Sequence, residues 1–135
     1  MEKEFVPYEL ALKLKTLGFN RECGACYYKK FDNEIGYHKV YRDFNSVSLT
    51  TSAPTFSQAF RWFREKYHIH GEPFYKRGLT KQTSWYDYKI YSTIDWINTN
   101  PKQQWKTYEE AELACLDKLI EIVEQTERIE HGVYR

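Results

Sequence analysis

The chain has 135 residues, of which 41% are hydrophobic and 18% are aromatic, with 12 Tyr against a single Met. This length and composition suit one folded domain with its own core and exclude a disordered protein. The formal net charge is +1, so overall charge gives no reason to expect a partner that is a nucleic acid or a membrane. We expect residues 1–135 to form a single domain.

From the sequence we expect neither a membrane span nor a secretory signal. No apolar run approaches the roughly 20 residues that a bilayer requires. The N-terminal MEKEFVPYEL lacks the apolar core of a signal peptide. Three Cys is an odd number, which without a signal peptide favours reduced thiols and therefore a cytoplasmic protein.

The first predicted element is a helix over VPYELALKLKTLG. Pro7 suits the first helical position, and Leu10, Leu14 and Leu17 recur at helical spacing. Gly18 follows them and is expected to end the helix in the left-handed conformation.

A hairpin is predicted next. ACYYK and YHKVY flank FDNEIG, which favours a turn around Asp32–Asn33. Val47–Leu49 is the candidate for a third short strand.

The second predicted helix is TFSQAFRWFREKY. Thr55 is the expected N-cap, and Phe56, Phe60, Phe63 and Tyr67 make an aromatic stripe along the helix.

The segment SWYDYKIYS alternates as a strand does, with EPFYK as a partner strand. The alternation places Tyr86, Tyr88 and Ile90 on one face. Trp85 and Tyr91 would lie on the other face, so this sheet is either covered on both sides or exposes aromatic rings to a partner.

The third predicted helix runs through YEEAELACLDKLIEIVEQ. It begins with a capping box of Thr107 and Glu110. Its apolar face is formed by Leu116, Leu119, Ile120, Ile122 and Val123. The order α-β-β-α-β-β-α predicts an α+β fold, with three helices packed on small antiparallel sheets.

Three segments together resemble a family of small uncharacterised proteins from phages and prophages of gut Bacteroidota. They are FVPYELALKLKTLGF, APTFSQAFRWFREKY and YEEAELACLDKLIEIV, which cover the three helices. The resemblance implies a phage or mobile-element accessory protein that works in the host cytoplasm. It implies no activity, cofactor or catalytic residue.

The RECGACYYKK segment contains a C-x-x-C pair, Cys23 and Cys26. A structural zinc needs four ligands, and the best second pair is His68 and His70, with His38 as an outlying alternative. A regular strand would place the two thiols on opposite faces, and H-x-H departs from the usual spacing of histidine ligands. We therefore expect reduced thiols and no metal.

A cysteine nucleophile is a further hypothesis, since the chain has three Cys and four His. Cys115 falls on the apolar face of the third helix, where burial would raise its pKa and make it inert. No third residue that would orient a Cys–His pair can be identified, so we expect a protein that is not an enzyme.

Basic residues alternate with aromatic residues in the middle of the chain. Guanidinium groups beside aromatic rings suit a nucleotide or a single-stranded nucleic acid. The candidate ligand-binding residues are Arg61, Arg64, His68, Trp85, Tyr86 and Tyr88, with Lys76, Arg77, Lys81 and Lys89 nearby. The alternative is that Arg61 pairs with Glu65 and that the aromatic residues belong to the core.

Glu112 falls within the apolar face of the third helix. A carboxylate there must be paired, protonated or beyond the edge of the core. We favour the last of these positions, and a buried Glu112 would indicate a pocket.

The sequence therefore predicts a binding protein without a cofactor. Its ligand would be a host protein or a small anionic molecule such as a nucleotide, and sequestering a host defence factor would suit such a protein. Single-stranded nucleic-acid binding is the alternative, and a small enzyme is third. Residues 61–89 carry seven Lys/Arg against three acids, whereas residues 108–128 carry seven acids against two bases, so a homodimer is a further hypothesis.

Overall fold

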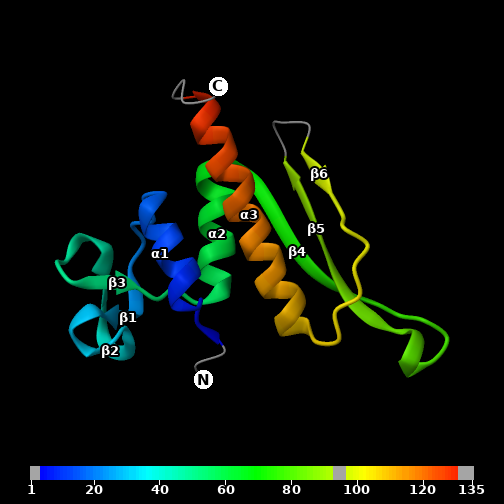
Figure 1. Cartoon of the computed structure of the whole chain (residues 1–135), viewed down its shortest axis with the longest axis horizontal. Helices are drawn as coiled ribbons and strands as arrows, with labels where there is room; N and C mark the ends of the chain where they lie inside the picture. The colour runs from blue at the N-terminus through cyan, green and yellow to red at the C-terminus, as the bar shows by residue number, and fades with distance from the viewer. Residues whose placement is uncertain (1–3, 93–96, 131–135) are drawn as a thin grey trace. The chain divides into compact units, whose positions relative to one another are not determined.

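A computed structural model describes residues 4–92 and 97–130 of the chain. Within them lie three α-helices and two three-stranded antiparallel sheets (Figure 1). The predicted α+β fold and its order of elements are confirmed, and each sheet has a third, short strand. The chain divides into two compact units, Met1–Trp62 and Phe63–Arg135, which we call the N-terminal and C-terminal units. That residues 1–135 form a single domain stays a prediction.

The first helix, α1, spans Tyr8–Thr16. Pro7 has an extended ψ of 153° and precedes the helix as its N-cap, so its predicted place at the first helical position is off by one residue. Gly18 has a φ of 95° and ends the helix in the left-handed region, as predicted. The amide of Phe19 then donates to the carbonyl of Leu14 at 2.9 Å, which satisfies one of the last helical carbonyls.

The N-terminal sheet has the strand order β2-β1-β3. Its strands are β1 (Cys23–Tyr28), β2 (Glu34–Arg42) and β3 (Thr50–Ser52). The predicted hairpin between β1 and β2 is confirmed, because Asp32 and Asn33 take up positive φ values of 52° and 62° at the turn.

The prediction of a strand at Val47–Leu49 is wrong. Leu49 has a φ of 65°, and a left-handed residue cannot continue an extended strand. The side chains of Val47 and Leu49 are exposed, whereas those of Thr50–Ser52 are buried. The strand therefore forms three residues later, where its side chains are covered.

The second helix, α2, spans Phe56–Tyr67, and the boundary between the two units falls within it. The predicted N-cap is confirmed: the hydroxyl of Thr55 accepts from the amide of Gln58 at 3.2 Å, and the side chain of Gln58 accepts from the amide of Thr55 at 2.9 Å. Three of the four residues of the predicted aromatic stripe are buried, and so is Trp62. The three are Phe56, Phe60 and Phe63.

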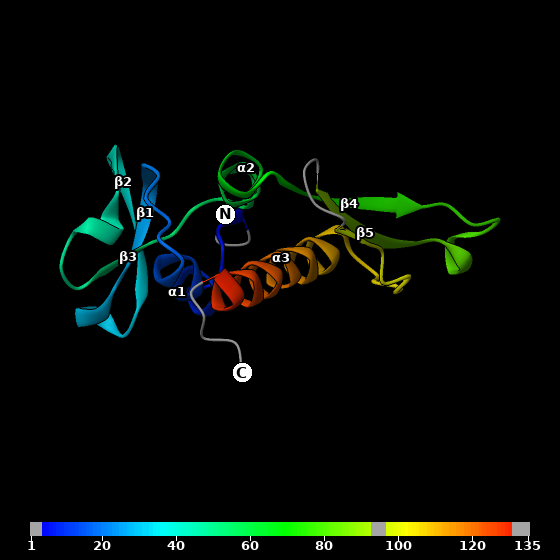
Figure 2. The same cartoon turned by 90° about the horizontal axis from the view of Figure 1, so that it is seen from above.

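The C-terminal sheet has the order β4-β5-β6, built from β4 (Ile69–Lys76), β5 (Trp85–Ser92) and β6 (Asn98–Thr99). The predicted pairing of EPFYK with SWYDYKIYS is confirmed, and these strands form a long hairpin (Figure 2). The short strand β6 was not predicted.

The middle of β5 is covered on both faces. Tyr88 and Ile90 are buried, and so is Asp87, which alternation places on the opposite face and which is only 1% exposed. One carboxylate oxygen of Asp87 accepts from the backbone amide of Tyr88 at 2.8 Å.

The third helix, α3, spans Tyr108–Glu130 and packs on β4 and β5 (Figures 1 and 2). The predicted cap is present, since the Thr107 hydroxyl accepts from the amide of Glu110 at 3.1 Å. Its buried side chains are Ala111, Cys115, Leu116, Leu119, Ile120 and Val123, whereas Ile122 is half-buried. None of the described helices is long and apolar enough to span a membrane.

Burial along α3 predicts the effect of shortening its leucines. We expect Leu119→Ala to reduce the free energy of unfolding by about 2–5 kcal/mol, because it leaves a cavity in a core that excludes water. Leu113→Ala is the matched control on the same helix, since Leu113 is 39% exposed, and it should cost less than about 1 kcal/mol. Urea unfolding followed by circular dichroism measures both. Equal losses would contradict the packing of α3 on the sheet.

Candidate functional site

The register between β1 and β2 changes between Cys23 and Ala25. Residues 38–41 of β2 stand opposite Gly24 alone, so β2 bulges away from its partner. A Cβ atom on Gly24 would lie 2.7 Å from the ring of Tyr41, so a larger residue there would require this exposed ring to shift. The bulge frees several side chains of β2 from regular pairing.

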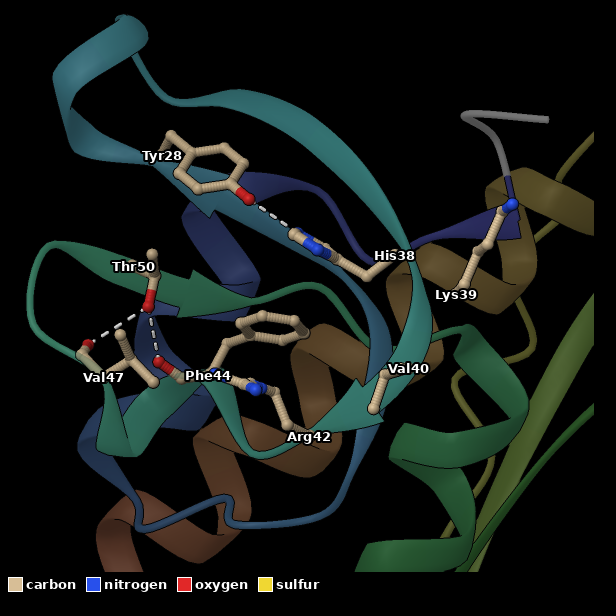
Figure 3. A pocket seen from close by; sticks show the side chains of 8 residues that line it. All are labelled: Tyr28, His38, Lys39, Val40, Arg42, Phe44, Val47 and Thr50. Atoms are coloured by element: carbon tan, nitrogen blue, oxygen red, sulfur yellow. Dashed lines mark hydrogen bonds between the residues drawn. The ribbon is translucent and has the colours of Figure 1, made fainter.

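A pocket of about 450 Å³ lies beside the bulge (Figure 3). This volume falls in the range of small-molecule sites, roughly 300–1,000 Å³. Its wall combines aromatic, aliphatic, hydroxyl and cationic groups. The lining residues are Tyr28, His38, Lys39, Val40, Arg42, Phe44, Val47 and Thr50, all from the N-terminal unit.

The imidazole of His38 is held in place from three sides. Its Nε2 lies 2.6 Å from the hydroxyl of Tyr28 and 3.5 Å from the sulfur of Cys26. Its ring packs on Phe44 with centroids 4.6 Å apart. Figure 3 shows the hydroxyl of Tyr28 directed at this ring. The pocket wall therefore contains an ordered aromatic and hydrogen-bonding surface.

The Cys26–His38 contact does not make an activated nucleophile. Cys26 is fully buried, and burial raises the pKa of its thiol, which outweighs the hydrogen bond from Tyr28 that lowers it. A thiol with a raised pKa is protonated at neutral pH and reacts slowly. Burial also raises the pKa of Cys115 to about 12, as its predicted place on the apolar face implies, and its lack of reactivity stays a prediction.

Two cations of the pocket have no carboxylate partner. Arg42 and Lys39 are exposed, and neither forms an ion pair with any residue in the described part of the chain. Positive charge without a counter-ion, beside apolar surface, favours an anionic ligand with an apolar part.

The cationic residues predicted on the second helix lie elsewhere. Arg61 and Arg64 are exposed on α2, and neither lines the pocket. His68 directly follows α2, is exposed and has a φ of 59°, so it ends the helix in the left-handed region.

The aromatic residues predicted on β5 have different surroundings. Trp85 and Tyr86 are half-buried, with the ammonium of Lys76 placed 5.8 Å from the ring centre of Trp85. Tyr88 is 5% exposed and stacks on Trp105 at 5.4 Å, so its ring belongs to the core of the C-terminal unit.

The residues considered as zinc ligands do not come together in the part of the chain that the structure describes. In residues 4–92 and 97–130, no three side chains of the His, Cys, Asp or Glu type are grouped as metal ligands would be. Cys23 and Cys26 belong to the N-terminal unit, where the irregular register between Cys23 and Ala25 means that simple alternation does not apply. His70 belongs to the C-terminal unit, where its ring stacks on Tyr91 at 5.0 Å.

Glu112 is half-buried on α3. Burial raises the pKa of its carboxyl, and the nearby charge of Glu109 raises it further. It is thus neither enclosed in the core nor fully beyond its edge.

The pocket residues were largely missed by sequence reasoning. His38 was considered only as an outlying zinc ligand, and Arg42 and Phe44 were not considered at all. Strand alternation alone gives no sign of the bulge that groups them. The one available signal is the glycine at position 24 within an apolar strand, since such glycines often mark bulges.

Comparison with known proteins assigns no family to the chain: no protein-family model, no curated protein and no solved structure matches it. The candidate site therefore has to be judged on its own geometry.

The thiols provide a direct test of the site chemistry. At pH 7.5 we expect none of Cys23, Cys26 and Cys115 to react with iodoacetamide in the native protein within an hour, because all three are buried and have raised pKa values. In guanidinium chloride all three should be alkylated, as shown by intact-mass spectrometry. Rapid native labelling of Cys26 alone would contradict this and indicate a thiolate activated by His38.

The raised pKa of Glu112 predicts a pH-dependent effect on stability. Because folding raises this pKa, the charged carboxylate lowers stability above the folded pKa, and this cost disappears below the unfolded pKa. Glu112→Gln should therefore stabilise the protein at pH 7 by less than about 1 kcal/mol, since the group is half-solvated, and should have no effect at pH 3.

Glu109→Gln is the matched variant, and it should lower the pKa of Glu112 in an NMR titration. A loss of stability at pH 7 in Glu112→Gln would instead reveal a favourable partner of the carboxylate.

Proposed function

We propose that the chain is a non-enzymatic binding protein that holds a small anionic ligand with a planar ring, such as a nucleotide. The observation that carries the proposal is the pocket beside the β2 bulge. There Arg42, which forms no ion pair with any residue in the described part of the chain, lies beside an aromatic wall formed by Tyr28, His38 and Phe44, and Lys39 lines the same pocket.

Each part of such a ligand has a matching group in the pocket. Arg42 can bind a phosphate or carboxylate through two parallel hydrogen bonds, which suits a guanidinium better than a lysine. The ring of the ligand would pack against Phe44 and the neighbouring valines. Tyr28 and His38 supply hydrogen-bonding atoms at the ring edge, and their mutual contact at 2.6 Å holds both side chains in position before the ligand arrives.

Binding without conversion fits the chemistry of this pocket better than catalysis. An enzyme needs an activated group in contact with its substrate. The contact that most resembles such a group, Cys26 with His38, contains a fully buried thiol whose pKa is raised. The described geometry thus favours holding a ligand over transforming it.

As to origin, we propose a phage or mobile-element accessory protein that acts in the host cytoplasm. This rests on the resemblance of the three helical segments to small phage and prophage proteins. Binding a nucleotide-like molecule without converting it would remove that molecule from solution. Such a protein would suit the sequestration of a small host signal.

The proposal is tested by native mass spectrometry of the purified protein and by calorimetry with nucleoside monophosphates, nucleosides and inorganic phosphate. We expect a nucleoside monophosphate to bind and Arg42→Ala to weaken it about 10- to 100-fold, because a charge-assisted hydrogen-bond pair is lost. The nucleoside alone should bind much more weakly than the nucleotide.

Arg61→Ala is the matched control, since this arginine is also exposed in the N-terminal unit but does not line the pocket. It should leave binding unchanged. If Arg61→Ala or Arg64→Ala weakens binding and Arg42→Ala does not, the ligand lies on α2 and the pocket is not its site. The absence of both a ligand adduct and any heat of binding would contradict the proposal and favour a host protein as the partner.

A further inference from the structure

The β4–β5 hairpin of the C-terminal unit ends in a projecting tip. The two strands pair in regular register up to Lys76 and Trp85, and residues 77–84 connect them. Figures 1 and 2 show this end of the hairpin extending beyond α3, the helix that packs on the strands. The tip is therefore accessible to a large partner.

The polar side chains of the tip are used to fold it. The amide of Gly78 donates to the hydroxyl of Ser84 at 2.9 Å, and that hydroxyl donates to the carbonyl of Thr80 at 2.8 Å. The amide of Thr80 donates to the hydroxyl of Thr83 at 2.9 Å. A Cβ atom on Gly78 would overlap the backbone of Thr83, so the close turn requires glycine. Hydrogen bonds therefore hold the loop of residues 77–84 in a defined conformation.

What this loop presents outward is one aliphatic side chain among cations. Leu79 is completely exposed, and Lys76, Arg77 and Lys81 around it are exposed as well. From Pro73 to Tyr86 the chain has these three cations and no acid.

The nearest carboxylates do not neutralise the tip. Glu72 forms an ion pair with Lys89 at 3.3 Å, and Asp87 is buried. The tip therefore carries a local charge of +3 on a chain whose formal net charge is +1.

Aromatic rings line the base of the same tip. Tyr75 is 52% exposed and packs on Tyr86 with ring centres 5.0 Å apart, and Trp85 is half-buried beneath Lys76. Exposed aromatic and aliphatic surface between cations suits a chain of phosphates that carries unstacked bases.

We propose that the tip of the β4–β5 hairpin binds single-stranded nucleic acid. Lys76, Arg77 and Lys81 contact phosphates, while Leu79 and Tyr75 contact bases. The basic residues that alternate with aromatic residues in this part of the sequence would then form the binding surface of the tip. The tip shares no residue with the pocket of the proposed function, and the inference does not depend on that function.

A single strand suits the tip better than the two other polyanionic partners, a nucleic-acid duplex and a membrane surface. Contact of Leu79 with bases in a duplex would require unstacking, which three cations are too few to offset, whereas the bases of a single strand are already accessible. A membrane surface is less suited, because Leu79 is the one fully exposed aliphatic side chain of the tip and stable anchoring needs a larger apolar face.

The test is fluorescence anisotropy of the full chain with a labelled 20-mer of dT, titrated at 25 to 150 mM salt. With three phosphate contacts, log K should fall against log salt with a slope of about −2, because roughly 0.7 counterion is released per contact on a single strand. Lys76→Ala/Arg77→Ala/Lys81→Ala should weaken binding at least about tenfold and bring the slope close to zero. Leu79→Ser should weaken binding without changing the slope.

Lys89→Ala is the matched control on the same hairpin, since Lys89 already pairs with Glu72, and it should change binding by less than about twofold. The triple variant should keep its circular dichroism spectrum and its nucleotide binding, so failure of this site is distinguishable from failure of the pocket. Equal loss in Lys89→Ala and the triple variant would overturn the proposal. So would binding to vesicles containing 30% phosphatidylserine but not to the oligonucleotide, or tighter binding to a duplex of the same length.

Discussion

The interrupted pairing between β1 and β2 is the constraint on which the N-terminal unit depends. Because residues 38–41 stand opposite Gly24 alone, β2 cannot follow the pleat of its neighbour. The ring of Tyr41 occupies the space where any larger residue at position 24 would place its Cβ atom. His38 and Arg42 line the pocket that lies beside this bulge. Alternation in a regular strand would place Lys39 on the face opposite His38 and Arg42, whereas all three line this pocket.

The reactive thiols of this protein are buried, whereas the cations that line the pocket are exposed. The three thiols, which carry the most reactive chemistry of the chain, are all enclosed, and burial raises the pKa of each. The exposed cations that line the pocket, Lys39 and Arg42, carry instead an ammonium and a guanidinium group, which bind anions without reacting with them. Such a distribution agrees with the binding function that we propose.

The near-zero net charge conceals this local organisation. At the tip of the β4–β5 hairpin, Glu72 pairs with Lys89, and the segment from Pro73 to Tyr86 has three cations and no acid. In the pocket, Lys39 and Arg42 likewise lack carboxylate partners among the described residues. The net charge counts all charged residues of the chain together, whereas an approaching anion responds to charges within about a Debye length, roughly 8–10 Å. Positive sites can therefore exist on a chain that is almost neutral as a whole.

The sequence by itself determined the helices, their caps and the first turn, because these depend on residues within four positions of each other. Thr55, Gly18 and Asp32–Asn33 have the conformations that their residue types favour, and the apolar stripes of α2 and α3 are buried except for the half-buried Tyr67 and Ile122. Only the tertiary structure decided the position of β3, the burial of Tyr88 against Trp105 and the pocket beside β2. The physical reason is that strand register and bulges are set by partners distant in the chain, so that the neighbours of a strand residue cannot be deduced from its own segment.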